Sequence, residues 1–278
     1  MKIVNLIENT PGAEECVPAH GLAFSVETVA HKILVDAGPS DETLRNAERL
    51  GVDLRTVDAV ILSHGHYDHS GGLLAFAELN PTAVIYMQRS AGGEYYAFDG
   101  PEKGYRYIGI DKSILLLPQV RLLSGDTRID DEIAVFTVER RNHPLPSTNK
   151  RIMKKEGEGY MQDDFVHEQS LYVRSVGASA VISGCAHSGV LNILEEFVRK
   201  FGRENLPQVV VSGFHLMRKT GYDDTDVCEQ EEIARRLMDY PCRFYTCHCT
   251  GVEPFARMKD IMGNRLEYVH TGGKIDVR

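Results

Sequence analysis

The stretch that decides the fold is Ser63-His64-Gly65-His66-Tyr67-Asp68-His69-Ser70-Gly71-Gly72, which places three histidines and an aspartate within six residues. It follows the largely apolar run Val57–Leu62, a pattern typical of a strand buried on both faces. Imidazole and carboxylate groups are good ligands for zinc, iron or manganese, and the glycines permit a tight path. The stretch therefore predicts a metal-binding loop at the end of a strand. A polar turn with solvated histidines is the alternative, and it suits a single histidine better than this cluster.

Outward from this loop, short apolar and β-branched runs predict strands, and apolar residues at helical spacing predict helices. The predicted strands are Lys2–Ile7, Gly21–Thr28, Lys32–Asp36, Val57–Leu62, Arg121–Ser124, Ile133–Glu139, Ala180–Ser183, Val209–Val211, Phe244–Thr246 and Leu266–Val269. The predicted helices are Ser40–Leu50, Gly71–Leu79, Val190–Phe201, Glu229–Met238 and Pro254–Met262. Both kinds of element occur in both halves, which favours an α+β fold with two sheets sandwiched between helix layers. No linker separates the halves, so we expect a single domain over residues 1–278, with an elaborated region at about 88–169.

Charge and hydropathy limit the partners. The chain has 31 basic and 40 acidic residues, a net charge of −9, which argues against an extended basic surface for nucleic acid. No apolar run approaches the roughly 20 residues that a membrane span needs, and the first residues lack the pattern of a signal peptide. We therefore expect a cytoplasmic protein with reduced cysteines and neither a nucleic-acid nor a membrane partner. The sequence carries no signal for its oligomeric state.

The stretch 63–72 resembles the metal-binding signature of the metallo-β-lactamase-fold superfamily, whose members bind one or two metals at the edge of a four-layer αββα sandwich. Further segments extend the resemblance over nearly the whole chain, although the middle region matches loosely. They are His20-Gly21-Leu22, Leu34-Val35-Asp36-Ala37-Gly38, the segment 182–189, Ser212-Gly213-Phe214-His215-Leu216 and Cys247-His248-Cys249-Thr250-Gly251. These segments are most similar to one branch, which is named for the archaeal dihydropterin-ribofuranosylaminobenzene 5′-phosphate synthase.

The resemblance implies a ligand set. His64, His66 and His187 would bind a first metal, and Asp68, His69 and His248 a second. Many superfamily members place a bridging aspartate in a Gly-Asp turn where this sequence has Gly184-Cys185. Cys185 then bridges as a thiolate, or His187 compensates, or the second site is weak.

Other residues have competing interpretations. His215 competes with His248 for the last ligand position or contacts substrate, Asp36 lies beside the site, and His20 lines it. His167, next to Glu168, is a further candidate ligand. Cys247 and Cys249 favour core packing. The basic residues in 150–155 are interpreted as a solvated face, with a clamp on a substrate phosphate as the alternative.

The function implied is that of a metal-dependent, dinuclear enzyme acting on a small-molecule substrate, with or without a phosphate group. Two divalent ions are expected, zinc first and manganese or iron as alternatives. In a hydrolase, the metals activate a water that Asp68 orients and deprotonates as the catalytic residue. In a synthase-like transferase, the metals stabilise a phosphate leaving group. The hypothesis from another class is a non-catalytic metal-binding or redox-sensing protein on the same fold, which Cys185 supports.

Overall fold

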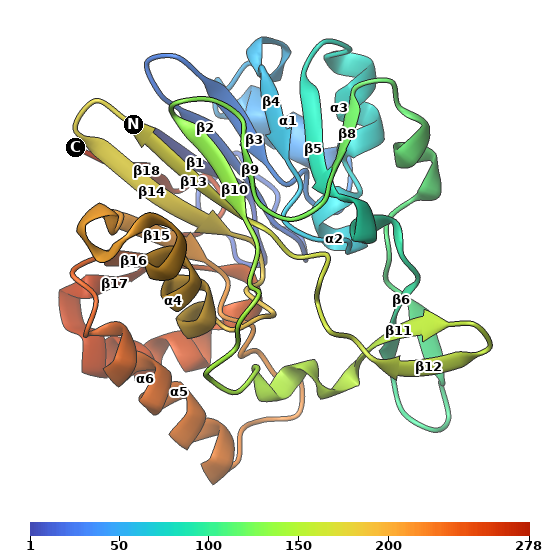
Figure 1. The fold of residues 1–278 in the computed structure, drawn as a ribbon, viewed down its shortest axis with the longest axis vertical. Coiled ribbons are helices and arrows are strands. Elements are labelled where there is room, and N and C mark those ends of the chain that lie inside the picture. Colours follow the sequence, from blue (N-terminus) through green and yellow to red (C-terminus); the bar gives the residue numbers. More distant parts are fainter.

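The computed structural model describes residues 1–278 and contains two seven-stranded sheets that face each other (Figure 1). The first sheet has the order β18-β1-β2-β3-β4-β5-β8. Its strands are β1 (Lys2–Ile7), β2 (Ala23–Glu27), β3 (Lys32–Val35), β4 (Ala59–Ile61), β5 (Val84–Gln88), β8 (Val120–Leu123) and β18 (Lys274–Asp276). Its helices are α1 (Glu42–Arg49), α2 (Tyr67–Ser70) and α3 (Leu73–Leu79).

The second sheet has the order β17-β16-β15-β14-β13-β10-β9. Its strands are β9 (Thr127–Arg128), β10 (Ile133–Phe136), β13 (Ser170–Ser175), β14 (Ala178–Ser183), β15 (Val209–Ser212), β16 (Arg243–Thr246) and β17 (Leu266–Tyr268). Its helices are α4 (Val190–Phe201), α5 (Asp224–Leu237) and α6 (Val252–Met262). Strands β14 to β17 run parallel, so the chain leaves β14, β15 and β16 at the same edge of the sheet.

Three layers of apolar side chains hold the sheets and helices together. The central layer lies between the two sheets and joins residues such as Phe24 and Val35 to Leu171 and Ile182. A second layer packs the first sheet against α1 and α3, and a third packs the second sheet against α4, α5 and α6. The order of layers is therefore helix, sheet, sheet, helix, and the prediction of an αββα sandwich is confirmed.

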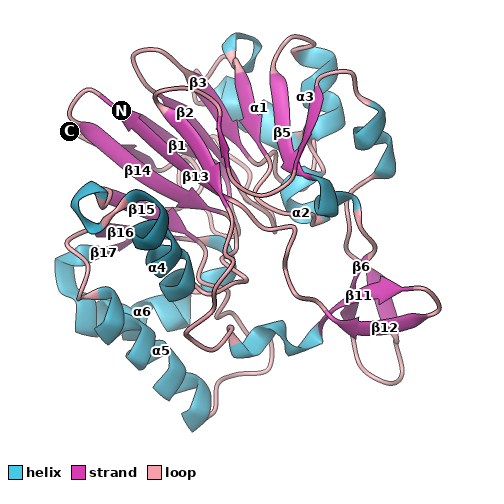
Figure 2. Ribbon diagram, in the orientation of Figure 1, coloured by secondary structure: helices cyan, strands magenta, loops and turns pink.

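The region at about 88–169 contributes strands to all three sheets. Its strands β8, β9 and β10 belong to the edges of the two large sheets. The rest forms a separate four-stranded sheet of order β12-β11-β6-β7, built from β6 (Tyr95–Phe98), β7 (Tyr105–Tyr107), β11 (Ile152–Glu156) and β12 (Gly159–Gln162). This small sheet projects from the body of the molecule (Figure 2). Its own apolar core has only five buried residues, which explains why its strands lack a clear apolar pattern.

Most predicted elements occur within a few residues of their predicted bounds. The largest shift concerns Glu229–Met238, which is the second part of a helix that begins at Asp224. The earlier start has a local cause, because the side chain of Asp223 accepts a hydrogen bond from the Asp226 amide and the Asp226 side chain reaches back to the Asp223 amide. In the two large sheets, the sequence does not predict strands β5, β9, β13 and β18. No helix is both long enough and apolar enough to cross a membrane.

Candidate metal centre

The predicted ligands meet at one end of the sandwich, where strands of both sheets finish. His64 and His66 follow β4, whereas His187, His215 and His248 follow β14, β15 and β16. Asp36, Ala186, His215 and His248 all have backbone φ angles between 50° and 58°, the left-handed region that non-glycine residues rarely adopt. Such strain persists only where the surrounding structure enforces it, and it concentrates at functional sites.

Three histidines form the first group. The ring centroids of His64, His66 and His187 lie 4.6 to 4.9 Å from one another, and all three side chains are buried. The Nε2 atom of each ring is buried and has no hydrogen-bond partner. A buried polar atom without a partner costs free energy, so three of them converging from two sheets point to a bound group that accepts their lone pairs.

The opposite nitrogen of these rings explains why Nε2 is left free. His64 Nδ1 lies 2.8 Å from Ser63 Oγ, which itself donates to Asp36 Oδ2 at 2.7 Å, so the ring must donate to the hydroxyl. His187 Nδ1 lies 2.9 Å from Asn149 Oδ1 and donates to it. In His64 and His187, Nδ1 therefore carries the proton and Nε2 presents a lone pair, as in metal sites whose ligands are oriented by a second layer of hydrogen bonds.

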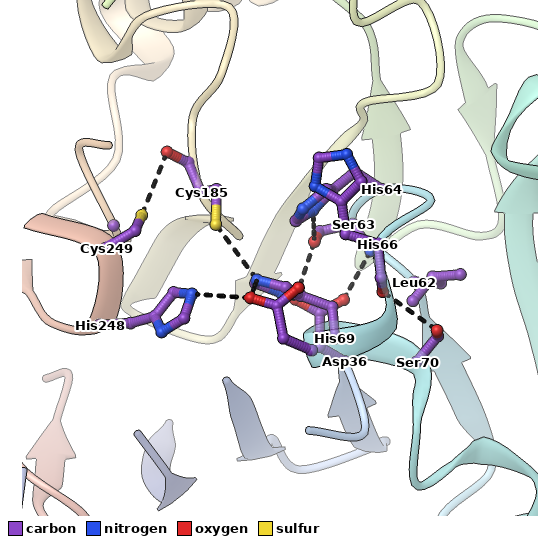
Figure 3. A network of polar contacts seen from close by, with 12 residues as sticks. Asp36, Leu62, Ser63, His64, His66, His69, Ser70, Cys185, His248 and Cys249 are labelled. Atoms are coloured by element: carbon purple, nitrogen blue, oxygen red, sulfur yellow. Dashed lines mark hydrogen bonds and ion pairs between the residues drawn. The ribbon is translucent and has the colours of Figure 1, made fainter. Parts of the chain in front are cut away.

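The second group contains Asp68, His69, Cys185 and His248. His69 Nδ1 lies 2.6 Å from Asp36 Oδ2, and its Nε2 lies 3.1 Å from the Cys185 sulfur, which points at the ring in Figure 3. Asp68 Oδ2 is 3.4 Å from His248 Nε2 and 3.9 Å from His69 Nε2. His248 Nδ1 is held by Asn9 Oδ1 at 2.8 Å. The arrangement again directs ring nitrogens and a carboxylate oxygen toward one another.

Electrostatics differ between the two groups. Burial lowers the pKa of His64 and His187 well below the usual imidazole range, and it lowers the pKa of His66 to about 3. Burial also acts on His69, but the Asp36 and Asp68 carboxylates outweigh it and raise the pKa of His69 to about 9.

Asp68 itself stays ionised, because His69, His248 and His20 outweigh the effect of burial and hold the pKa of its carboxyl well below the usual range. The first group therefore supplies neutral imidazole lone pairs, and the second group supplies a buried carboxylate. Divalent cations of the zinc type prefer this donor chemistry.

The residues present fit a bound divalent cation. Ligand atoms of His64, Cys185 and His187 lie within 4.8 Å of one another, and so do those of His69, Cys185 and His248. Cys185 belongs to both sets, which is the position of a bridging ligand. Its thiol pKa is raised well above the ordinary value by burial and by the neighbouring Cys249.

Two further predicted residues line the same cavity, which has a volume of about 270 Å³. His215 packs against His187 with ring centroids 4.1 Å apart and ring planes tilted by 54°, and its Nδ1 is buried without a partner. It also belongs to a set with Cys185 and Cys249. His20 lies at the mouth, with half of its side chain exposed and its Nε2 3.5 Å from Asp68 Oδ2. Of the six predicted ligands, His66, Asp68, His187 and His248 line this cavity. His64 and His69 are fully buried and pack against these rings.

Two sequence expectations need correction. Cys249 was assigned to core packing with Cys247; Cys247 does pack between the sheets, but Cys249 lines the cavity. The reason is that a short 3₁₀ turn starting at His248 replaces the extended path assumed for these residues. His167 was a candidate ligand, but both of its ring nitrogens form hydrogen bonds within the protein. Nδ1 accepts from the Gly65 amide at 3.0 Å, and Nε2 donates to Asp163 at 3.0 Å.

Several supporting residues had no signal in the sequence. Asn9 and Asn149 orient His248 and His187, and the Glu168 carboxylate accepts from the amides of His187 and Ser188 at 2.6 and 2.8 Å. They come from loops distant in sequence from the rings that they hold. Only the fold brings them to the site.

Residues 18–148 match the profile of the Metallo-beta-lactamase superfamily. Together with the αββα layers and the histidine cluster at their edge, this match identifies a metallo-beta-lactamase superfamily domain that includes residues 18–148. The class predicted from residues 63–72 is thereby confirmed.

Particular relatives extend the likeness over the whole chain. An uncharacterized protein of Methanocaldococcus jannaschii is 27% identical across 98% of both chains. The 7,8-dihydropterin-6-methyl-4-(β-D-ribofuranosyl)-aminobenzene-5′-phosphate synthase of the same organism is 24% identical across 98% of this chain and 95% of its own. Among solved structures, a metal-dependent hydrolase of the beta-lactamase superfamily is 27% identical and superposes with a TM-score of 0.82, covering 100% of this chain and 99% of that one.

Proposed function

We propose that this protein is a dinuclear metal-dependent hydrolase that acts on a small-molecule substrate in the cytoplasm, with zinc as the first choice of metal. The observation that supports it most is the set of three buried Nε2 atoms of His64, His66 and His187, which have no partner within the protein. The likeness to a metal-dependent hydrolase over the whole chain supports the same class.

The ligand assignment follows the two groups described above. His64, His66 and His187 would hold one ion, and Asp68, His69 and His248 the other, with Cys185 between them. Bound divalent ions supply Lewis-acid polarisation of the substrate and lower the pKa of a coordinated water. His215 remains beside His187 as a contact for substrate or as a substitute ligand.

Side chains of the protein then transfer the proton of the attacking water. Asp68 is ionised and buried, so its Oδ2 accepts a proton from the attacking water as the general base. His20 Nε2 lies 3.5 Å from that oxygen and is half exposed, so it passes the proton on to solvent. Asp36 and Asn149 keep the His69 and His187 rings from turning, so the acceptor geometry is fixed before substrate arrives.

A synthase-like transferase is the second candidate, favoured by the 24% identity to the M. jannaschii synthase over nearly the full length of both chains. Fold and metal site alone host many reactions. The two candidates differ in the product, because the transferase would join two substrates and release a phosphate-containing leaving group. A hydrolase would consume water and a single substrate.

A non-catalytic metal-binding or redox-sensing protein is the third candidate. The Cys185 sulfur, 3.1 Å from His69 Nε2, is the observation that favours it. Turnover of any substrate that depends on the bound metal would exclude this candidate.

Elemental analysis of the purified protein, followed by a substrate panel on the same sample, tests the proposal. We expect about two divalent ions per chain, a loss of metal in His66→Ala and in His187→Ala, and no loss in the surface control His31→Ala. The panel contains bis-p-nitrophenyl phosphate, lactones and the pterin-type condensation. Wild-type metal content in both ligand variants would show that the assignment is wrong.

A further inference from the structure

The cavity above the histidines has a wall of positive charge that the metal centre does not explain. Arg106, Arg151, Arg218 and Lys219 line it, and Asp68 is the only acidic residue among the lining side chains. The chain as a whole carries a net charge of −9. A dication site is stabilised by negative charge, so four cations beside it must serve something else. We call these four residues the cationic wall.

The cationic wall comes from two separate parts of the fold. Arg106 lies on β7 of the small projecting sheet, and Arg151 ends the 3₁₀ turn that leads into β11 of the same sheet. Arg218 and Lys219 lie in the loop between β15 and α5. The small sheet and this loop thus contribute cations to one cavity whose histidines come from the large sheets.

The charges of the cationic wall are only partly neutralised. Asp99 pairs with both Arg106, at 2.7 Å, and Arg151. Asp226 pairs with Arg218 at 2.5 Å. Two carboxylates therefore face four cations. The Nε atoms of Arg151 and Arg218 are buried and lack any hydrogen-bond partner, so the protein does not satisfy all the donors of either guanidinium.

We propose that the cationic wall binds the phosphate group of a phosphorylated small molecule and thereby sets the substrate class of the metal centre. With Asp68 counted as part of the metal centre, four cations and two paired carboxylates leave the wall an excess of two positive charges. This excess matches a phosphate monoester dianion, whereas a carboxylate would neutralise only one charge. Guanidinium groups suit phosphate because their fork of donors matches two oxygens at once. The phosphate group binds at the cationic wall and positions the substrate so that its reacting bond lies toward the histidines.

The size of the cavity limits the rest of the substrate. At about 270 Å³ it is close to the lower end of the range for small-molecule sites. A phosphorylated metabolite fits this volume, whereas a polymer would have to extend into solvent. The assignment of the reacting end rests on the proposed function, but phosphate binding at the wall does not.

Isothermal titration of inorganic phosphate into the metal-loaded protein tests the proposal without any activity assay. Arg218→Met removes one cation of the wall. Arg151→Lys keeps the charge but removes the paired donors of the guanidinium. Arg121→Met is the matched control, on β8 and outside the cavity. We expect Arg218→Met to weaken phosphate binding at least about tenfold, Arg151→Lys to weaken it less, and Arg121→Met to leave it within about twofold. Circular dichroism and metal content confirm that the variants are folded and loaded.

Two comparisons separate this proposal from the proposed function. His66→Ala should lose metal, and we expect it still to bind phosphate at the cationic wall. If phosphate binding were lost together with the metal, phosphate would be binding the ions instead, and the proposal would be overturned. Sulfate is expected to compete with phosphate and acetate to compete poorly. Equal phosphate affinity in wild type and Arg218→Met, or equal competition by acetate, would also overturn it. Absence of hydrolysis with phosphate binding intact would instead count against the hydrolase.

Discussion

Asp36 anchors the metal-binding loop 63–72 through hydrogen bonds. Its removal should lower both the free energy of unfolding and the affinity for metal. Its carboxylate accepts from the Ser63 amide at 2.7 Å, the Ser63 hydroxyl at 2.7 Å and His69 Nδ1 at 2.6 Å, and the side chain is buried. Asp36→Ala leaves three buried donors without an acceptor. At about 1–3 kcal/mol for each buried unsatisfied group, partly relieved by relaxation and water, we expect a loss of about 3–6 kcal/mol in the free energy of unfolding.

The metal effect follows from the same contacts. Ser63 orients His64 and Asp36 orients His69, so one substitution releases a ring in each ligand group. Loss of such supporting partners costs about 10–100-fold in metal affinity. Asp36→Asn keeps the volume and tolerates the left-handed backbone better, so it should lose metal affinity with a smaller loss of stability.

Urea unfolding of the metal-free proteins and competition with a chelator measure the two effects separately. The control is Asp260→Ala, an exposed aspartate on α6, which should change the free energy of unfolding by less than about 0.5 kcal/mol. If Asp36→Ala unfolded within about 1 kcal/mol of wild type and retained wild-type metal affinity, the network could not have the supporting role described here.

Three further predictions follow from other contacts. Asn149→Ala should lower metal affinity about 10–100-fold, because His187 loses the acceptor of its Nδ1 proton; chelator competition measures it, and unchanged affinity would contradict the assigned tautomer. His20→Ala should keep full metal content but lower kcat on whichever ester of the panel is hydrolysed, by about 10–100-fold; a change in KM alone would argue against the proton relay. Gly184→Ala should lower the free energy of unfolding by about 1–3 kcal/mol, because a Cβ there would overlap Ser63 Oγ and crowd Asp36. Urea unfolding measures this loss. An unchanged unfolding midpoint would show that the loop can shift to accept the methyl group without loss of stability.

Local sequence was enough to predict the loop 63–72, because its ligands are adjacent in the chain and the glycines and preceding strand are beside them. The later ligands His187 and His248 follow β-like runs, and the family resemblance related them to the loop. Contacts between distant loops had no such signal. Asn9 and His248 are 239 residues apart in the chain, and Asn149 and His187 are 38 apart. Of the cationic wall, the sequence singled out only Arg151, within the basic stretch 150–155. Arg106, Arg218 and Lys219 were missed for the same reason, since they come from segments distant in the chain.

The division of the ligands between the two sheets has a mechanical consequence. His64, His66, Asp68 and His69 belong to the first half of the sandwich, whereas Cys185, His187 and His248 belong to the second. Each bound ion would therefore cross-link the two halves at their interface. A local opening that parts the sheets at this edge would release metal, so the rate of metal loss should report how often the halves separate. Neither half alone would retain the ions, and their binding would couple the two halves into one cooperative unfolding unit.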